Sequence, residues 1–241
     1  MDINDSNFKN IDLKQRIADF EKSAKNVVIS YGGDGTLLKT FHDNPTKAII
    51  PVRDYGTCDM HSGLLDDILN GTAKCKAELR QTTGDLIDCD GKVAMSEVQL
   101  ISADPTMCLR FDVRVNSKLF MDNVIANGIV VSTILGSTGY FKSVARTIFR
   151  NGYGLGFICP TYGINNLVLR PTDQVEIIMR RDCKAYICWD HIKETVDLHV
   201  KDVKAFHLSS DVVSLFGYEE FMCPLCRKGR NSTLVNDQYC V

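Results

Sequence analysis

The apolar run Val27–Tyr31, which leads into the turn Gly32–Thr36, constrains the fold more than any other feature of this chain. Its β-branched residues predict a buried strand, and its glycines allow torsions and close approaches that a Cβ would block. Main-chain N–H groups in such a turn can point at an anion, with Asp34 beside them. We therefore predict that Asp34 is catalytic; the simpler alternative is that it only caps the next helix. The predicted phosphate-binding residues of the turn are Gly32, Gly33, Gly35 and Thr36.

Composition and charge limit the classes of protein that this chain can belong to. Its 241 residues, 44% apolar and 24% charged, are typical of a globular protein with one large domain or two small ones. A net charge of -2 argues against a surface that binds DNA or RNA. No apolar run approaches the roughly 20 residues of a membrane span, and the N-terminus lacks a signal pattern. We therefore expect a cytoplasmic protein that binds neither nucleic acid nor membrane.

The ten cysteines are expected to be mostly reduced core thiols, because the chain is large for a disulfide framework. Cys223 and Cys226 form the only C-x-x-C pair, whereas a structural zinc site normally needs two such halves or a matching histidine pair. Cys240, His207 or His199 would complete such a site only at non-standard spacing. We predict no bound structural metal and a plain turn at this pair.

The first part of the chain alternates helical and strand patterns. Apolar residues recur at helical spacing over residues 11–25, and Ala48–Val52 predicts a second buried strand. A further helix is predicted over residues 64–69, with Ser62 as its N-cap and Asn70-Gly71 as its end. Helices that separate apolar strands predict an α/β domain with a parallel sheet, which we place at residues 1–76.

The second part, residues 77–216, predicts a β-rich, sandwich-like domain. Residues 109–115 alternate apolar and polar side chains, a period of two that is typical of a half-buried strand. Residues 217–241 are too short for a domain, and one hypothesis is that they pack back on the first. Further strands are predicted over residues 93–101, 128–133, 175–179, 185–189, 196–200 and 203–208.

A second glycine turn interrupts this β-rich region. The strand that ends at Ser132-Thr133 leads into Gly136–Tyr140, and a helix is predicted from Tyr140 to Phe149, closed by Asn151-Gly152. A strand end, a hydroxyl-rich turn and a helix N-terminus together favour anion binding, because the first N–H groups of a helix are unpaired. The candidate binding residues here are Gly136, Ser137, Thr138, Gly139 and Tyr140.

Three segments, in this order, resemble the signatures of the NAD kinase family. They are Gly32–Thr36, Ser96-Glu97-Val98, and Asn127–Thr133 leading into Gly136–Tyr140. The first segment is shared with diacylglycerol kinases, sphingosine kinases and phosphofructokinases, whereas the last segment is more particular to NAD kinases. The resemblance spans roughly residues 27 to 175 and is dense only at these segments. It implies an α/β N-terminal domain, a β-rich C-terminal domain and a cleft between them.

The resemblance also implies an activity and a set of roles. ATP, with Mg²⁺, would phosphorylate the adenosine-ribose 2'-hydroxyl of NAD or NADH, and Asp34 would be the general base. Ser96 and Glu97 would approach the riboses and adenine, and Thr138, Gly139 and Tyr140 would line the adenine pocket. Family members are usually dimers or tetramers, so a homo-oligomer is implied. The resemblance does not decide whether the acceptor is NAD or NADH, or whether the phosphoryl donor is ATP or polyphosphate.

Departures from the family pattern leave other functions open. Ser96 and Asn127 stand where the family usually has asparagine and aspartate, and Arg53-Asp54-Tyr55-Gly56 replaces a glycine-asparagine segment. Another kinase that uses the same turn, for a lipid or a sugar, and a dinucleotide-binding sensor with weak turnover are therefore the alternatives. Arg53 and Arg146 are candidate phosphate contacts because a guanidinium fork suits phosphate oxygens; the alternative for Arg146 is a solvated helix face.

Overall fold

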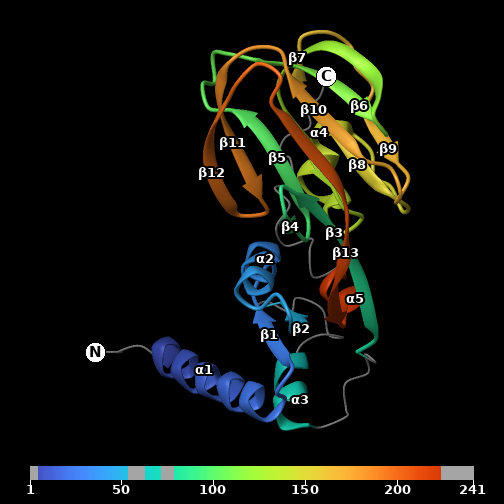
Figure 1. The fold of residues 1–241 in the computed structure, drawn as a ribbon. Helices are drawn as coiled ribbons and strands as arrows, with labels where there is room; N and C mark the ends of the chain where they lie inside the picture. Colours follow the sequence, from blue (N-terminus) through green and yellow to red (C-terminus); the bar gives the residue numbers. More distant parts are fainter. Residues whose placement is uncertain (1–4, 54–62, 72–78, 224–241) are drawn as a thin grey trace, which may run out of the picture. The chain divides into compact units, whose positions relative to one another are not determined.

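The computed structural model describes residues 5–53, 63–71 and 79–223, with side chains from Leu13 onward. These residues fall into two compact units. Unit 1 contains the described residues up to Thr82 and from Ser214 on, and unit 2 contains Thr83–Val213. Figure 1 shows their helices and strands along the chain. Among the described residues, no helix is long and apolar enough to span a membrane.

Unit 1 is built on parallel strands, as the sequence predicted. β1 pairs in parallel with β2 along its whole length, and β2 pairs in parallel with the end of β13 at Ile49 and Leu215. Helix α1 lays Leu13, Ile17 and Phe20 against the buried residues of these strands. Its elements are α1 (Asp5–Ser23), β1 (Val27–Tyr31), α2 (Asp34–Asp43), β2 (Ala48–Val52), α3 (Leu64–Asn70), α5 (Tyr218–Phe221) and the last residues of β13 (Val203–Phe216).

The two ends of α3 can be compared with the capping residues that the sequence predicted. Gly71 ends the helix in the left-handed conformation at φ 62°, as the Asn70-Gly71 pair predicted. At the other end the N-cap is Gly63, at φ 84°. The proposed cap Ser62 lies outside the described residues.

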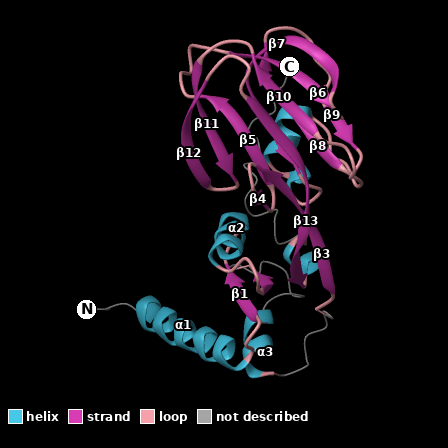
Figure 2. Cartoon of the chain, in the orientation of Figure 1, coloured by secondary structure: helices cyan, strands magenta, loops and turns pink. Residues whose placement is uncertain are grey.

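Unit 2 is built mainly from antiparallel strands (Figure 2), and their buried side chains form one apolar core. The long strand β7 organises it, because residues up to Ala126 pair with β6 while Gly128–Ser132 pair with β5. Beyond β6 lie β10 and β13, and beyond β5 lie β11 and β12. The bounds are β3 (Gln81–Cys89), β4 (Lys92–Ala94), β5 (Glu97–Ser102), β6 (Leu109–Val115), β7 (Lys118–Ser132), β8 (Tyr153–Pro160), β9 (Leu167–Leu169), β10 (Val175–Met179), β11 (Cys183–Trp189) and β12 (Ile192–Leu198).

The two faces of strands β7 and β8 bury different partners. Side chains such as Ile129 and Val131 enter the core, whereas Val130 on the opposite face packs against Phe141 and Phe149. Phe141 belongs to α4 (Tyr140–Ala145), which follows the 3₁₀ turn η1 (Gly136–Thr138). The helix therefore covers the outer face of the sheet over β7 and β8.

The predicted helix from Tyr140 to Phe149 is wrong in its second half. α4 ends at Ala145, because Arg146 turns into the left-handed conformation at φ 58°. Phe149 then folds back to meet the Phe141 ring edge-on, with centroids 5.2 Å apart. Gly152 does not close the helix. A Cβ there would lie 1.8 Å from the carbonyl oxygen of Leu169, so this glycine permits a close backbone approach.

Candidate functional site

In unit 1, the turn after β1 contains two glycines that differ in the space around them. Gly32 has φ 154°, and a Cβ on it would lie 2.4 Å from Thr36 Oγ1, so the turn itself excludes a side chain. Its N–H donates to the carbonyl oxygen of Val52 at 2.8 Å, which ties the turn to the end of β2. Gly35 has open space around it, because a Cβ on this residue would meet no atom within 4 Å. The fold requires Gly32 and leaves room at Gly35.

Asp34 is the first residue of α2 and is not its cap. The N-cap is Gly33, which makes no side-chain bond, and the Asp34 side chain is 52% exposed. Asp34, Gly35 and Thr36 form an exposed row at the helix start, while Leu37 anchors the helix in the interior. An acidic group at this end is favoured by the helix dipole, and the first N–H groups are unpaired within the helix. The geometry argues against the capping alternative for Asp34.

Arg53 is a buried residue that pairs with Asp34. Its side chain is 4% exposed, and its Nη2 donates to Asp34 Oδ1 at 2.8 Å. Its Nε donates to the carbonyl oxygen of Phe221 at 3.0 Å, and the guanidinium carbon lies 3.7 Å from the centre of the Phe221 ring. The other residues of the Arg53–Gly56 segment lie outside the described residues. The sequence therefore found Arg53 but not its partner in α5.

In unit 2, Asp190 shapes the Ser96–Glu97 segment. This carboxylate follows β11 and accepts the backbone N–H groups of Met95, Ser96 and Glu97 at 2.9, 2.8 and 3.1 Å. Three donors on one carboxylate fix the short bend between β4 and β5. Sequence reasoning missed Asp190, because an aspartate after a strand carries no signal of the distant segment that it holds.

The two predicted binding segments of unit 2 touch each other. The backbone N–H of Thr133 donates to the carbonyl oxygen of Ser96 at 2.9 Å, and Thr133 Oγ1 donates to that of Met95 at 2.7 Å. A Cβ on Gly136 would lie 2.2 Å from the Ser96 carbonyl oxygen. The glycine is therefore needed for this contact, and the second turn is built directly on the Ser96–Glu97 segment.

Glu97 is a buried acid beside this turn. Only 9% of the residue is exposed, and Ser96 Oγ donates a hydrogen bond to its carboxylate. Burial raises the pKa of Glu97; the Ser96 bond opposes the rise and the nearby Asp190 adds to it. Burial also raises the pKa of Tyr140, and the acidic groups around it include Glu97. Tyr140 is 38% exposed, so part of its ring is open to solvent.

The remaining predicted residues of unit 2 have different surroundings. Ser137 is buried and donates its hydroxyl to the carbonyl oxygen of Ile134 at 2.8 Å, whereas Gly139 is exposed and Thr138 is half-buried. Asn127 is half-buried and accepts a hydrogen bond from Cys108 Sγ at 3.2 Å. Arg146 is exposed, where α4 ends. Ser137 therefore supports the turn, while Gly139 and Tyr140 are open to solvent.

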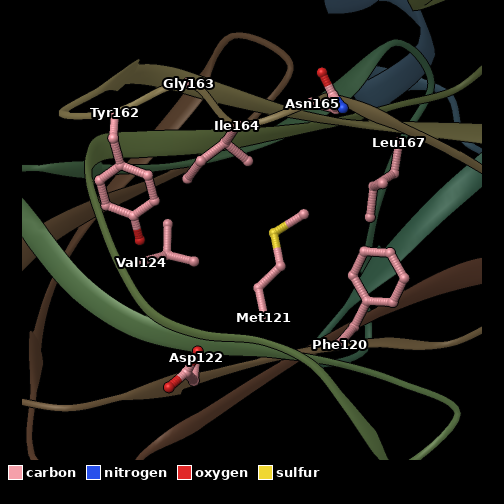
Figure 3. Close-up of a pocket in the computed structure, with 9 residues that line it drawn as sticks. All are labelled: Phe120, Met121, Asp122, Val124, Tyr162, Gly163, Ile164, Asn165 and Leu167. Carbon is pink, nitrogen blue, oxygen red and sulfur yellow. The ribbon is translucent and has the colours of Figure 1, made fainter.

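A cavity elsewhere in unit 2 contains none of the predicted site residues. It holds about 490 Å³, and Figure 3 shows Met121, Ile164 and Leu167 pointing into it. Its rim includes Phe120 and Tyr162, which are 55% and 48% exposed. Its lining is mainly apolar and has no counterpart to the anion-binding turns, so we do not assign it to the chemistry. No group of three or more metal-ligating side chains occurs among the described residues.

Comparison with solved structures defines the fold. An NAD kinase from Archaeoglobus fulgidus in complex with ATP superposes with a TM-score of 0.68 over 90% of this chain and 92% of that chain, at 18% identity. A yeast NADH kinase complexed with NADH gives 0.63 over 88% of this chain and 68% of that chain, at 16% identity. The fold is thus that of the NAD kinases.

Curated sequences agree with the structural comparison, although no family model matches the chain. An NAD kinase of Lactobacillus acidophilus is 29% identical over 77% of this chain and 74% of its own length. That of Streptococcus pyogenes serotype M1 is 32% identical over 68% and 64%. A bifunctional NADP phosphatase/NAD kinase of Methanocaldococcus jannaschii is 29% identical over 74% of this chain, which spans only 34% of that protein. The chain is a divergent member of the NAD kinase family.

Proposed function

We propose that this protein transfers the γ-phosphoryl group of ATP to the adenosine-ribose 2'-hydroxyl of NAD or NADH, which gives NADP or NADPH. The half-exposed carboxylate of Asp34 carries the proposal, because it stands at the start of α2, makes no cap and is held by an ion pair. The family membership of the chain and the ligands in the two related structures, ATP and NADH, support the choice of substrates.

Asp34 would accept the proton of the attacking hydroxyl. A carboxylate is a weak base at neutral pH, but phosphoryl transfer through a loose transition state requires little proton removal until late. Orientation of the hydroxyl is then the larger contribution. The backbone N–H groups of the exposed residues Gly35 and Thr36, at the first turn of α2, would suit the phosphate oxygens. Both groups lie within unit 1.

We assign the dinucleotide to the segments of unit 2. Thr138, Gly139 and Tyr140 are consecutive, the last two of them are exposed, and the Tyr140 ring suits stacking on adenine. The buried Glu97 would accept hydrogen bonds from ribose hydroxyls, which bind more strongly where water is excluded. Ser96 and Asn127 are assigned to the same ligand, with Gly136 and Ser137 as the support of the turn. We also propose that the two units are the functional domains of the chain.

Mg²⁺ is proposed to enter with ATP. This ion is usually held by substrate phosphates, water and one or two carboxylates, so it does not require a cluster of protein ligands. The half-exposed Asp34 carboxylate is the side chain of the glycine turn that fits this pattern. The bound ion would neutralise charge on the phosphates.

A homo-oligomer, a dimer or a tetramer, is part of the proposal. The family resemblance supports it, and so does the apolar cavity rim with the exposed rings of Phe120 and Tyr162. Sedimentation of the purified protein at several concentrations measures the state directly. The cytoplasmic location expected from the sequence remains a prediction.

The test is a direct assay of products. Purified protein with Mg²⁺ receives labelled ATP and, in separate reactions, NAD, NADH, diacylglycerol or a nucleoside, and each product is separated and counted. The proposal expects label in NADP or NADPH alone. Label in the lipid or nucleoside would establish another kinase. Tight NAD binding without label, with polyphosphate also tried as donor, would favour the sensor, a function that the departures at Ser96 and Asn127 also suit.

A further inference from the structure

Arg53 is a charged side chain in an unusual position, because it follows β2 and is 4% exposed. Burying a charge is costly unless it is paired and hydrogen-bonded, and buried ion pairs are often no more stabilising than apolar side chains of the same size. Stability alone therefore does not explain an arginine here. Its partners indicate what the burial achieves.

The guanidinium joins α5 to Asp34. Its Nε and its flat face are taken by the carbonyl oxygen and the ring of Phe221, at 3.0 and 3.7 Å. Its Nη2 reaches Asp34 Oδ1 at 2.8 Å. Its Nη1 is buried and has no acceptor among the described residues. The group is thus clamped from behind by α5 and presents one donor to a carboxylate that is itself half exposed.

We propose that Arg53 is a positioning residue for Asp34. Fixed by Phe221, it holds Oδ1 and so sets the direction in which the carboxylate meets the substrate hydroxyl. The inference rests on the proposed function, in which Asp34 contributes more by orientation than by basicity. It replaces the sequence-based idea of Arg53 as a phosphate contact, since the Nε and Nη2 donors are engaged by protein atoms and Nη1 is buried.

The first test compares two arginines of unit 1 that each pair with an aspartate. Arg53→Met removes the proposed clamp; Arg16→Met is the control, because Arg16 bonds Asp66 at 2.9 Å on another helix pair. Arg53→Met is expected to lower kcat for NADP formation about 10- to 100-fold. KM for NAD and ATP is expected to stay within about threefold, because the loss is confined to the transition state. Arg16→Met should leave both parameters unchanged.

Urea unfolding of the same variants separates positioning from structural support. Positioning predicts an Arg53→Met midpoint close to the wild-type one together with a reduced kcat. A merely structural arginine predicts the reverse, a lower midpoint with a normal kcat per folded molecule, and that result overturns the inference. Should Arg53→Met fail to fold, Arg53→Lys decides: it keeps the charge and loses the fork, so a folded Lys variant with wild-type kcat also contradicts the proposal.

The double variant tests whether Arg53 acts through Asp34. Combined with Asp34→Asn, the Arg53→Met change is expected to lower kcat no further, because the two residues work as a unit. Multiplicative losses would show an independent role for Arg53 and overturn the inference while leaving the proposed function intact. A wild-type protein that forms no NADP would overturn the proposed function and this inference together.

Discussion

The glycine turn of unit 1 and the glycine turn of unit 2 use the same kinds of residue under opposite conditions. Asp34 is half exposed and is held by one buried side chain, whereas Glu97 is buried and its segment is held through three backbone N–H groups. The Arg53 contact orients one carboxylate that stays open to solvent, while the three backbone bonds fix the shape of a whole segment. The difference suits a reactive group in unit 1 and a binding surface in unit 2.

Within each turn, one glycine supports the fold and another is left open. Gly32 and Gly136 would each place a Cβ within 2.5 Å of other atoms, at 2.4 and 2.2 Å. Gly35 has open space, and a Cβ on Gly139 would come only to 3.3 Å of the nearest oxygen. The sequence of each motif alone does not reveal this division between supporting glycines and open ones.

The largest effect on stability is expected from Asp190→Ala, which removes the acceptor of three backbone N–H groups. Leaving partly buried donors unpaired should lower the free energy of unfolding by roughly 2–4 kcal/mol and weaken NAD binding. Asp182→Ala is the control, because the exposed Asp182 accepts one backbone N–H, that of Val200, and lies 3.7 Å from His199 Nδ1. Urea titrations and NAD binding isotherms measure both. Unchanged NAD affinity in folded Asp190→Ala would contradict the binding role of this segment.

Gly136→Ala against Gly139→Ala tests the division of glycines in unit 2. The first change forces a methyl group toward the Ser96 carbonyl oxygen and should cost about 1–3 kcal/mol of unfolding free energy. The second lies at the exposed surface and should change stability by about 0.5 kcal/mol or less. Thermal or urea unfolding decides. Equal losses for the two variants would show that the packing difference has no energetic meaning.

In unit 1, a comparison of Gly35→Ala with Gly32→Ala likewise tests which glycine supports the fold and which is left open. Gly32→Ala should destabilise the fold by about 1–3 kcal/mol, because its φ and Thr36 both exclude a methyl group. Gly35→Ala should raise the unfolding free energy by up to about 1 kcal/mol, since alanine is the better helix former. It should nevertheless raise KM for ATP. Wild-type kinetics in Gly35→Ala would mean that phosphate does not approach this position closely.

The smallest effect concerns the pH dependence of stability. Because burial raises the pKa of Glu97 above its ordinary 4.5, the folded state binds this proton more tightly than the unfolded state. Its contribution to stability is therefore full below pH 4.5 and is lost as the pH rises through the folded pKa. Glu97→Gln should be more stable than wild type at pH 7, with a gap that shrinks toward pH 4 in urea titrations. A gap that widens on acidification would have the wrong sign.

Local patterns predicted the parts of the fold that depend on local chemistry. The strands over residues 48–52, 109–115 and 175–179 were predicted with the bounds that the structure has, because their apolar runs or alternation are unbroken. β8 was missed because its glycines weaken the strand pattern. Gly154 leaves room for the rings of Phe141 and Phe149, because a Cβ on this residue would lie 2.6 Å from each ring. Such long-range packing leaves no periodic signal.

The candidate site divides in the same way. The glycine turns were readable because each is a short motif after a strand, and Ser96–Glu97 was found through its resemblance to a family signature. Asp190 and Phe221 were not, since they act on Ser96 and Arg53 across 94 and 168 positions of the chain. A supporting residue is defined by what it touches, so the sequence predicted the groups that we propose for ligand binding and missed those that hold them.

The measurement that tests the central claim most directly is the rate of NADP formation by Asp34→Asn beside its NAD affinity. The exposed amide keeps the shape of the side chain and loses the acceptor for the proton. We predict a kcat lower by about 100- to 10,000-fold, with an NAD dissociation constant like that of the wild type. A variant that forms NADP within a few-fold of the wild-type rate, with unchanged affinity, would contradict the role of Asp34 as the base.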